Sequence, residues 1–303
     1  MSETTMKLSY NDFKNEVKEN IPHYFKTQEY RVIFDKAEKN NVTYDTISFV
    51  SGTMGPCVYL QKEYENFIQS GIVFSGYMAS LAARVNNSFK SASKIQGTVN
   101  SVLQFDLIRT KIYPRIVRKS GNEDFLNNKV YEEVADLAVL YFVSVKLANR
   151  DSGIITIPKT LFDSWNIDIQ TLHDTAFSNL EKDHLFICPI SDLLPMMGEM
   201  GEIPDPVDMY VVSNSTKNYG AACMLSSKVM EELKEKLGSF YIIPSSIHEF
   251  IAIPTVRDQE NVDVSEIVEM IRDVNASSVP DEDILSDSLY GYDFENHTLY
   301  VVA

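Results

Sequence analysis

The longest uncharged apolar run in the chain, LAVLYFVSV at Leu137–Val145, is only nine residues long. A membrane-spanning helix needs about 20 apolar residues, so this run is too short to cross a bilayer as a helix. It is rich in β-branched and aromatic residues, which is typical of a buried strand. With 44% hydrophobic and 11% aromatic residues overall, the chain is expected to pack a globular core around such strands.

The N-terminal part shows helical and hairpin patterns. Phe13, Val17 and Ile21 recur every four residues and predict a helix that ends at Pro22. Residues 30–49 alternate in polarity around an Asn-Asn pair, which predicts a β-hairpin because asparagine tolerates the positive φ of tight turns. Further helices are expected at 61–69 and 74–89, and extended segments are expected at 110–118, 135–145 and 153–157.

The C-terminal part mixes strand and helix patterns without regular alternation. Paired strands are expected at 208–213 and 221–225, and two more strands at Phe240–Ile243 and Phe250–Ile253. Predicted helices lie at 169–180, 228–237 and 264–274, the first capped by Asp168 and the last by Asp263. The stretch 193–206, rich in Met, Gly and Pro, is expected to be a loop or a broken helix.

These patterns predict the fold class α+β, with mixed or antiparallel sheets, packed helices and a two-part architecture. Residues 1–130 are expected to form a helix-rich N-terminal part with a β-hairpin. Residues 131–303 are expected to form an α+β C-terminal domain.

The hexapeptide PSSIHE at 244–249 lies between two apolar runs and contains hydroxyl, imidazole and carboxylate groups. One interpretation is a hydrolase, with Ser245 or Ser246 as the nucleophile, His248 as the base and Glu249 orienting it. No G-x-S-x-G elbow precedes the serines, and Glu249 would point away from the others in an extended loop. The preferred interpretation is a hairpin end whose serines hydrogen-bond the backbone.

Other catalytic and binding motifs are absent from the sequence. It holds no phosphate-binding glycine loop and no H-E-x-x-H pair, and the acids after Pro280 do not have calcium-loop spacing. We therefore expect neither a cofactor nor a metal. Asp136, at the start of the long apolar run, is either a perturbed carboxylate or a residue that accepts backbone hydrogen bonds at the end of a strand.

Charge is unevenly distributed along the chain, whose net charge is −16. Residues 258–303 hold twelve acids against one base, and residues 84–119 hold eight bases against one acid. The acidic balance argues against nonspecific binding of nucleic acid or an anionic membrane, except locally through the basic segment 84–119. That segment is expected to be a solvated face or to dock on the acidic C-terminal part.

The cysteines and the N-terminus predict a cytoplasmic location. Cys57, Cys188 and Cys223 are isolated and odd in number, which favours reduced thiols in a protein core. The N-terminal residues MSETTMKLSYNDF show neither the basic region nor the apolar region of a secretory signal.

Several stretches resemble a family of gut anaerobic bacteria that consists of an uncharacterised domain of unknown function. They are MYVVSNSTKNYGAACML, FYIIPSSIHEFIAIP and MIRDVNASSVPDEDILSDSLYGYD in the C-terminal half, with VYEEVADLAVLYFVSVK and TIPKTLFDSWNI before them. The C-terminal order is similar, more distantly, to another uncharacterised bacillus-type family. The resemblance covers nearly the whole chain, supports the fold prediction and implies no activity.

Three hypotheses for function follow. The preferred one is a non-catalytic cytoplasmic interaction protein, whose acidic C-terminal face meets a basic protein partner. Asp281, Glu282, Asp283 and Asp287 are its expected partner-binding residues. The alternatives are a hydrolase that uses the Ser-Ser-Ile-His-Glu loop, and an acidic surface that mimics nucleic acid and blocks a nucleic-acid-binding protein.

Overall fold

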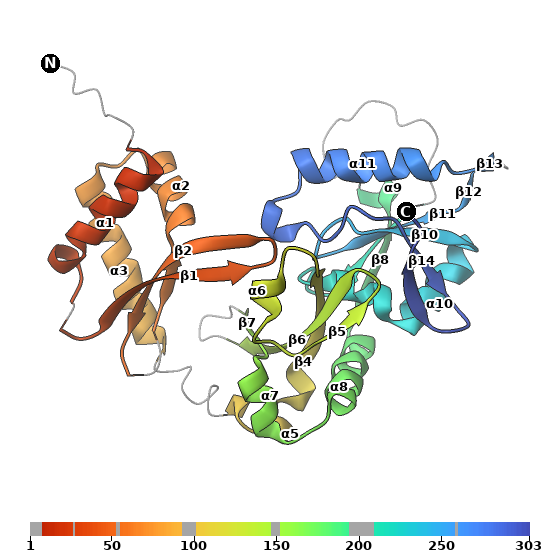
Figure 1. Ribbon diagram of the computed structural model, residues 1–303, viewed down its shortest axis with the longest axis horizontal. Helices are drawn as coiled ribbons and strands as arrows, with labels where there is room; N and C mark the ends of the chain where they lie inside the picture. Colours follow the sequence, from red (N-terminus) through yellow and green to blue (C-terminus); the bar gives the residue numbers. More distant parts are fainter. Residues whose placement is uncertain are drawn as a thin grey trace, which may run out of the picture. The chain divides into compact units, whose positions relative to one another are not determined.

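The computed structural model describes residues 8–26, 28–52, 55–92, 101–146, 152–193, 209–257 and 260–303 (Figure 1). It confirms the α+β class, with antiparallel sheets and packed helices. The chain divides into two compact units. The first comprises residues 1–100 and 147–150, and the second comprises 101–146 and 151–303. Most of the stretch expected at 193–206 lies outside the described residues.

In its described residues, the first unit has a three-stranded antiparallel sheet, in the order β1-β2-β3, and three helices. Its elements are α1 (Tyr10–Tyr24), β1 (Arg31–Lys39), β2 (Val42–Val50), β3 (Cys57–Tyr59), α2 (Leu60–Ser70) and α3 (Phe74–Ala92). The expected hairpin is confirmed, and Asn41 adopts a φ of 59° at its turn. Phe13, Val17 and Ile21 are buried as the periodicity predicts. Pro22 does not end α1 but lies inside its last turn, because Phe25 still closes the helix by donating its N–H to the carbonyl of Ile21.

The described part of the second unit contains two large sheets and one small two-stranded sheet. In the first sheet, β4 (Ile112–Arg118) pairs along one edge of β6 (Leu137–Lys146), and β5 (Tyr131–Val134) and β7 (Ser152–Thr156) pair with successive parts of the other edge. Pro114 lies on the edge strand β4, as expected of a residue that cannot donate a ladder hydrogen bond. The domain boundary expected at residue 130 falls inside this unit, between β4 and β5, which both pair with β6.

The other sheet has six strands in the order β15-β14-β10-β11-β9-β8. They are β8 (Leu185–Pro189), β9 (Tyr210–Asn214), β10 (Phe240–Ile243), β11 (Phe250–Pro254), β14 (Tyr290–Asp293) and β15 (Thr298–Val301). The short strands β12 (Val256–Arg257) and β13 (Glu260–Asn261) form a separate hairpin.

Helices and short turns complete the second unit. They are α5 (Phe105–Ile108), η1 (Arg109–Lys111), α6 (Glu123–Leu126), α7 (Lys159–Trp165), α8 (Ile169–Lys182), α9 (Ile190–Leu193), η3 (Gly220–Leu225), α10 (Ser227–Leu237), α11 (Val264–Ser277) and η4 (Asp281–Asp283). Helix α8 packs on β4 through its buried residues Leu172, Ala176 and Leu180. Figure 1 shows α11 and α10 on opposite faces of the six-stranded sheet. No helix in the described part of the chain has both the length and the apolar character needed to cross a membrane.

The prediction of a strand at 221–225 is wrong, because these residues form the 3₁₀ segment η3. Lys217 and Tyr219 adopt positive φ values of 51° and 56°, which turn the chain tightly after β9. The side chains of 221–224 are fully buried, so their apolar character reflects burial rather than strand formation. A short apolar run does not distinguish the two by itself.

Gly220 is the residue that allows η3 to approach its neighbours. A Cβ atom at this position would lie 2.1 Å from Ser213 Oγ, 2.6 Å from the backbone nitrogen of Asn214 and 2.7 Å from the carbonyl oxygen of His248. Two of these three atoms belong to the backbone, so a side chain cannot be accommodated by rotating one neighbour.

We expect Gly220→Ala to lower the free energy of unfolding of the second unit by about 3 kcal/mol or more, since backbone must move to admit the methyl group. Trp165, the single tryptophan of the chain, is buried in this unit and reports its unfolding in urea by fluorescence. The matched control is Gly121→Ala. Gly121 has a φ of 79° but open space around it, so the control should cost only about 1 kcal/mol of backbone strain. Equal effects of the two substitutions would contradict the close-approach explanation.

Candidate functional site

The loop at residues 244–249 closes the hairpin of β10 and β11, in which Ile243 is paired with Ile251. The prediction that PSSIHE forms a hairpin end is therefore confirmed by the backbone. His248 lies in this loop with both ring nitrogens close to other groups. Its Nδ1 accepts the backbone N–H of Tyr219 at 3.1 Å, and its Nε2 lies 3.3 Å from Asp283 Oδ1.

The serines of this loop do not approach the imidazole nitrogens. Ser246 Oγ accepts the backbone N–H of His248 at 3.0 Å, and the Ser246 N–H donates to the carbonyl of Glu249 at 3.1 Å. The carboxylate beside the imidazole is Asp283 rather than Glu249. A base needs a free nitrogen to take the proton of a nucleophile. In this geometry Tyr219 and Asp283 face the two nitrogens, so the loop does not present Ser245 or Ser246 to a free base.

The acids expected to bind a partner are engaged within the fold. Asp283 faces His248, and its carbonyl accepts the N–H of Ile247 at 2.8 Å. Asp287 forms an ion pair with Arg118 and accepts a hydrogen bond from Asn275 at 2.8 Å. Asp281 and Glu282 also take part in interactions within the chain. This cluster therefore holds the C-terminal segment in place.

The ion pair between Arg118 and Asp287 joins the basic segment 84–119 to the acidic C-terminal part. At this one position, a residue of the basic segment contacts the acidic C-terminal part. Burial raises the pKa of Asp287, but the hydrogen bonds from Asn275 and Arg118 and the charges of Arg118 and Arg272 outweigh it. The pKa of this carboxyl therefore lies below its ordinary value.

Asp136 accepts hydrogen bonds from three side chains of the C-terminal segment. Tyr290 donates at 2.6 Å, Ser286 at 3.3 Å and Ser288 at 3.5 Å. Burial and the hydrogen bond to Asp136 raise the pKa of the Tyr290 phenol above its ordinary value. Of the two interpretations of Asp136, the structure supports a hydrogen-bond acceptor at the start of a strand, but the donors are side-chain hydroxyls rather than the expected backbone N–H groups.

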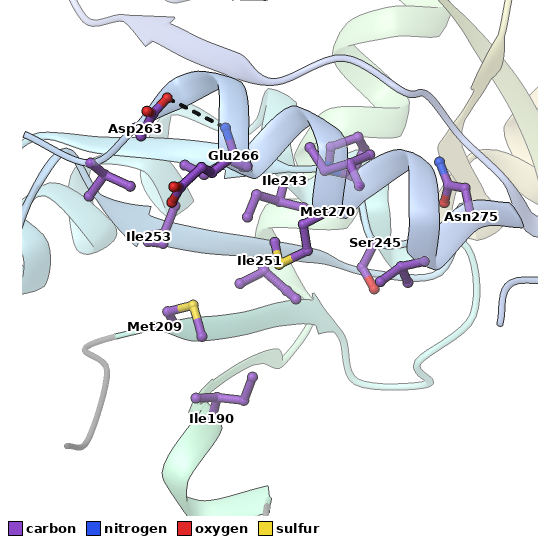
Figure 2. A pocket seen from close by; sticks show the side chains of 15 residues that line it. Ile190, Met209, Ile243, Ser245, Ile251, Ile253, Asp263, Glu266, Met270 and Asn275 are labelled. Atoms are coloured by element: carbon purple, nitrogen blue, oxygen red, sulfur yellow. Dashed lines mark hydrogen bonds between the residues drawn. The ribbon is translucent and has the colours of Figure 1, made fainter. Parts of the chain in front are cut away.

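A groove of about 430 Å³ lies between α11 and the six-stranded sheet (Figure 2). In Figure 2, Met270 of α11 and Ile251 of β11 point toward one another across it. Its lining is mostly apolar and comprises Ile190, Met209, Ile243, Pro244, Ser245, Ile251, Ile253, Val262, Asp263, Glu266, Ile267, Met270, Ile271, Val274 and Asn275. Ser245, first noted in the sequence as a possible nucleophile, thus lies in the wall of this groove.

The helix wall of this groove has an exposed apolar edge. Met270 is 47% exposed and Val274 is 44% exposed, although they lie one turn apart beside the buried residues Ile267 and Ile271. Val274 therefore remains partly uncovered, although it belongs to the same helix and is as apolar as its buried neighbours. The apolar surface of α11 is therefore wider than the part that its neighbours cover.

A hydrogen-bonded cluster of Glu132, Tyr141 and His173 was not found from the sequence. Tyr141 donates its hydroxyl hydrogen to Glu132, and His173 Nδ1 lies 2.8 Å from the same carboxylate oxygen. Burial, followed by the hydrogen bond to Glu132, raises the pKa of the Tyr141 phenol. The three residues come from β5, β6 and α8, so no local spacing could reveal the cluster.

The cysteines are free but are not all in the core. Cys223 is buried, Cys188 is half-buried and Cys57 is exposed, so the expectation of core thiols is correct only for Cys223. Burial, with a smaller effect of the charge of Asp183, raises the pKa of the Cys223 thiol to about 12. Within the described ranges, no group of three or more His, Cys, Asp or Glu side chains is placed to hold a metal ion.

We expect His248→Ala to lower the free energy of unfolding by about 1–3 kcal/mol, because it leaves the N–H of Tyr219 without its acceptor. The change is measured by urea unfolding followed through Trp165 fluorescence. His184→Ala is the matched control, because His184 is exposed and donates a hydrogen bond through its backbone N–H, and it should change stability by less than about 0.5 kcal/mol. A His248→Ala protein as stable as wild type would contradict the structural role.

We expect the contribution of Asp287 to stability to depend on pH. A carboxyl whose pKa is lowered in the folded state stabilises the protein above its unfolded pKa of about 3.9, and the stabilisation is lost as the pH falls through the folded value. Asp287→Asn should therefore be less stable than wild type at about pH 6, and the difference should shrink below about pH 4. In a protein that already carries Arg118→Met, the loss of stability caused by Asp287→Asn at about pH 6 should be smaller. A deficit that is the same at every pH would contradict the assignment.

Comparisons with known proteins add a family but no activity. A family model described as a family of unknown function (DUF5688) matches residues 10–294. No curated protein matches the chain significantly, and neither does any solved structure. Because the matched range covers nearly the whole chain, this protein belongs to the family of unknown function DUF5688.

Proposed function

We propose that this protein is a non-catalytic binding protein that receives a polypeptide of a partner protein in the groove along α11. The observation that carries the proposal is the groove itself, which has a volume of about 430 Å³ and an apolar lining with few polar groups. Apolar concave sites with a small number of polar groups at their edges are typical of binding sites.

The geometry around His248 supports binding over catalysis. A serine hydrolase needs an imidazole nitrogen directed at the nucleophile and a second nitrogen held by a carboxylate. Here the nitrogen that would serve the serine accepts the backbone N–H of Tyr219 instead. The hydroxyl of Ser245 in the groove wall then acts as a polar contact for the bound chain.

Charge supports a basic partner. The first unit is nearly neutral, with 12 basic and 10 acidic residues, whereas the second unit has 15 basic and 33 acidic residues. The groove lies in the acidic unit, where the field attracts cations and repels nucleic acid. Under this proposal the protein acts in the cytoplasm, and the partner-facing acids are those of α11 rather than the internally bonded Asp283 and Asp287.

The proposal is tested with a phage-displayed library of random dodecapeptides. We expect the wild-type protein to enrich peptides that bind at least roughly tenfold more weakly to the double variant Met270→Asn/Val274→Asn, because both substitutions place amides on the exposed apolar edge. Leu107→Asn is the matched control, since Leu107 is an exposed apolar residue of the same unit that does not line the groove. Trp165 fluorescence verifies that all variants fold.

Two results would overturn the proposal. One is the absence of any enriched peptide. The other is enrichment of peptides whose affinity is unchanged by the groove variant, which would place the binding surface elsewhere.

A further inference from the structure

We infer that the groove along α11 takes the apolar face of a cationic amphipathic helix from a partner protein. This inference rests on the proposed function and adds the chemistry and conformation of the bound segment. Three observations carry it, namely the shape of the groove, its exposed apolar edge and the position of acids beside that edge.

The groove is long and narrow. Its lining residues along α11 run from the N-cap Asp263 to Asn275. At 1.5 Å per residue this length is about 18 Å. A volume of about 430 Å³ spread over such a length accommodates one row of side chains. A helix of three to four turns presents a row of that length through apolar residues spaced three and four apart.

The exposed edge of the groove is suited to an apolar row. Met270 and Val274 lie four residues apart and are nearly half exposed, so a second helix packed beside α11 would cover both. Methionine has a flexible, polarisable side chain that adjusts to the shape of a bound partner. Opposite this edge, Ile251 and Ile253 of β11 provide the apolar floor.

Acidic side chains lie directly beside this apolar edge. With about 100° per residue, Glu266 lies about 40° and Asp273 about 60° around α11 from Met270. Both are exposed. Arg272, the one basic residue of α11, lies on a different side of the helix, where its charge acts on Asp287. A segment lying on Met270 and Val274 therefore meets carboxylates along its flank, and lysine or arginine side chains on that flank would complement them.

The test uses three synthetic peptides of about 14 residues with the same helical apolar positions, in which the flanking residues are all Lys, all Gln or all Glu. Fluorescence anisotropy measures the binding of each labelled peptide to the full-length protein. We expect the Lys peptide to bind at least roughly tenfold more tightly than the Gln peptide, and the Glu peptide not to bind. The preference should decrease as salt rises from about 50 mM to 500 mM.

Variants then locate the charge effect. Glu266→Gln/Asp273→Asn should weaken binding of the Lys peptide roughly fivefold to tenfold and leave the Gln peptide unchanged. Glu231→Gln/Glu235→Gln is the matched control, because it removes two exposed acids from α10 on the opposite face of the sheet. A proline in the middle of the Lys peptide should abolish binding, since it breaks the helix.

Each outcome has a separate meaning. If the Lys and Gln peptides bind equally well and both lose binding in the groove variant, the inference that the partner segment is cationic is overturned, whereas the proposed function is not contradicted. Undiminished binding of the proline peptide would overturn the helical conformation alone. Binding that is unaffected by Met270→Asn/Val274→Asn, or no binding of any of the three peptides, would overturn the inference. The phage-display experiment that tests the proposed function decides independently whether the groove binds peptides of another kind.

Discussion

The close approach of Gly220 to β9 and to the 244–249 loop is the constraint on which the second unit depends. Because this residue has no Cβ, the buried segment η3 contacts both Ser213 and the carbonyl of His248. Ser213 donates its hydroxyl hydrogen to that same carbonyl at 2.8 Å, and Tyr219 donates its N–H to the imidazole. One small residue thus lets β9, the hairpin loop and η3 share a set of hydrogen bonds.

Tyr219 extends this junction to the four-stranded sheet. Its ring packs against Phe142 of β6, with ring centroids 5.7 Å apart, and lies 5.2 Å from the guanidinium of Arg115 on β4. Phe125 lies on the guanidinium as well, at 5.4 Å. The two sheets of the second unit are therefore linked through aromatic and cation–π contacts around one tyrosine that is held in a left-handed backbone conformation.

Arg115 is an unusual element of this junction because it is only 7% exposed. Burial lowers its pKa, and its Nε has no hydrogen-bond partner among the described residues. Desolvating a cation costs several kcal/mol, which two aromatic faces offset only in part. The contacts of Arg115 with the rings of Tyr219 and Phe125 therefore explain its buried position better than a net gain in stability does.

The sequence predicted the elements whose signals are local. The apolar run at 137–145, the Asn-Asn hairpin and the Asp168 cap of α8 each depend on neighbours within a few residues, and each is confirmed. The strand prediction for 221–225 failed because burial on all sides produces the same apolar run in a strand and in a 3₁₀ turn. The clusters around His248 and Tyr141 could not be predicted from the sequence, since their members come from elements far apart in the chain and their contacts depend on tertiary packing.

The groove illustrates why a site is harder to predict than the element that carries it. The sequence predicted the helix α11, but the positions of its apolar residues do not show how much of the helix the sheet covers. Ile267 and Ile271 are covered, whereas Met270 and Val274 on the same helix remain nearly half exposed. Apolar surface left uncovered beside acidic residues favours association with a partner of opposite charge, because the apolar contact supplies affinity while the charges select and orient the partner. Acids that are hydrogen-bonded or ion-paired within the fold, such as Asp287, contribute to the electrostatic field but make no direct contact with the partner. The acids beside Met270 should therefore determine which basic partner is bound.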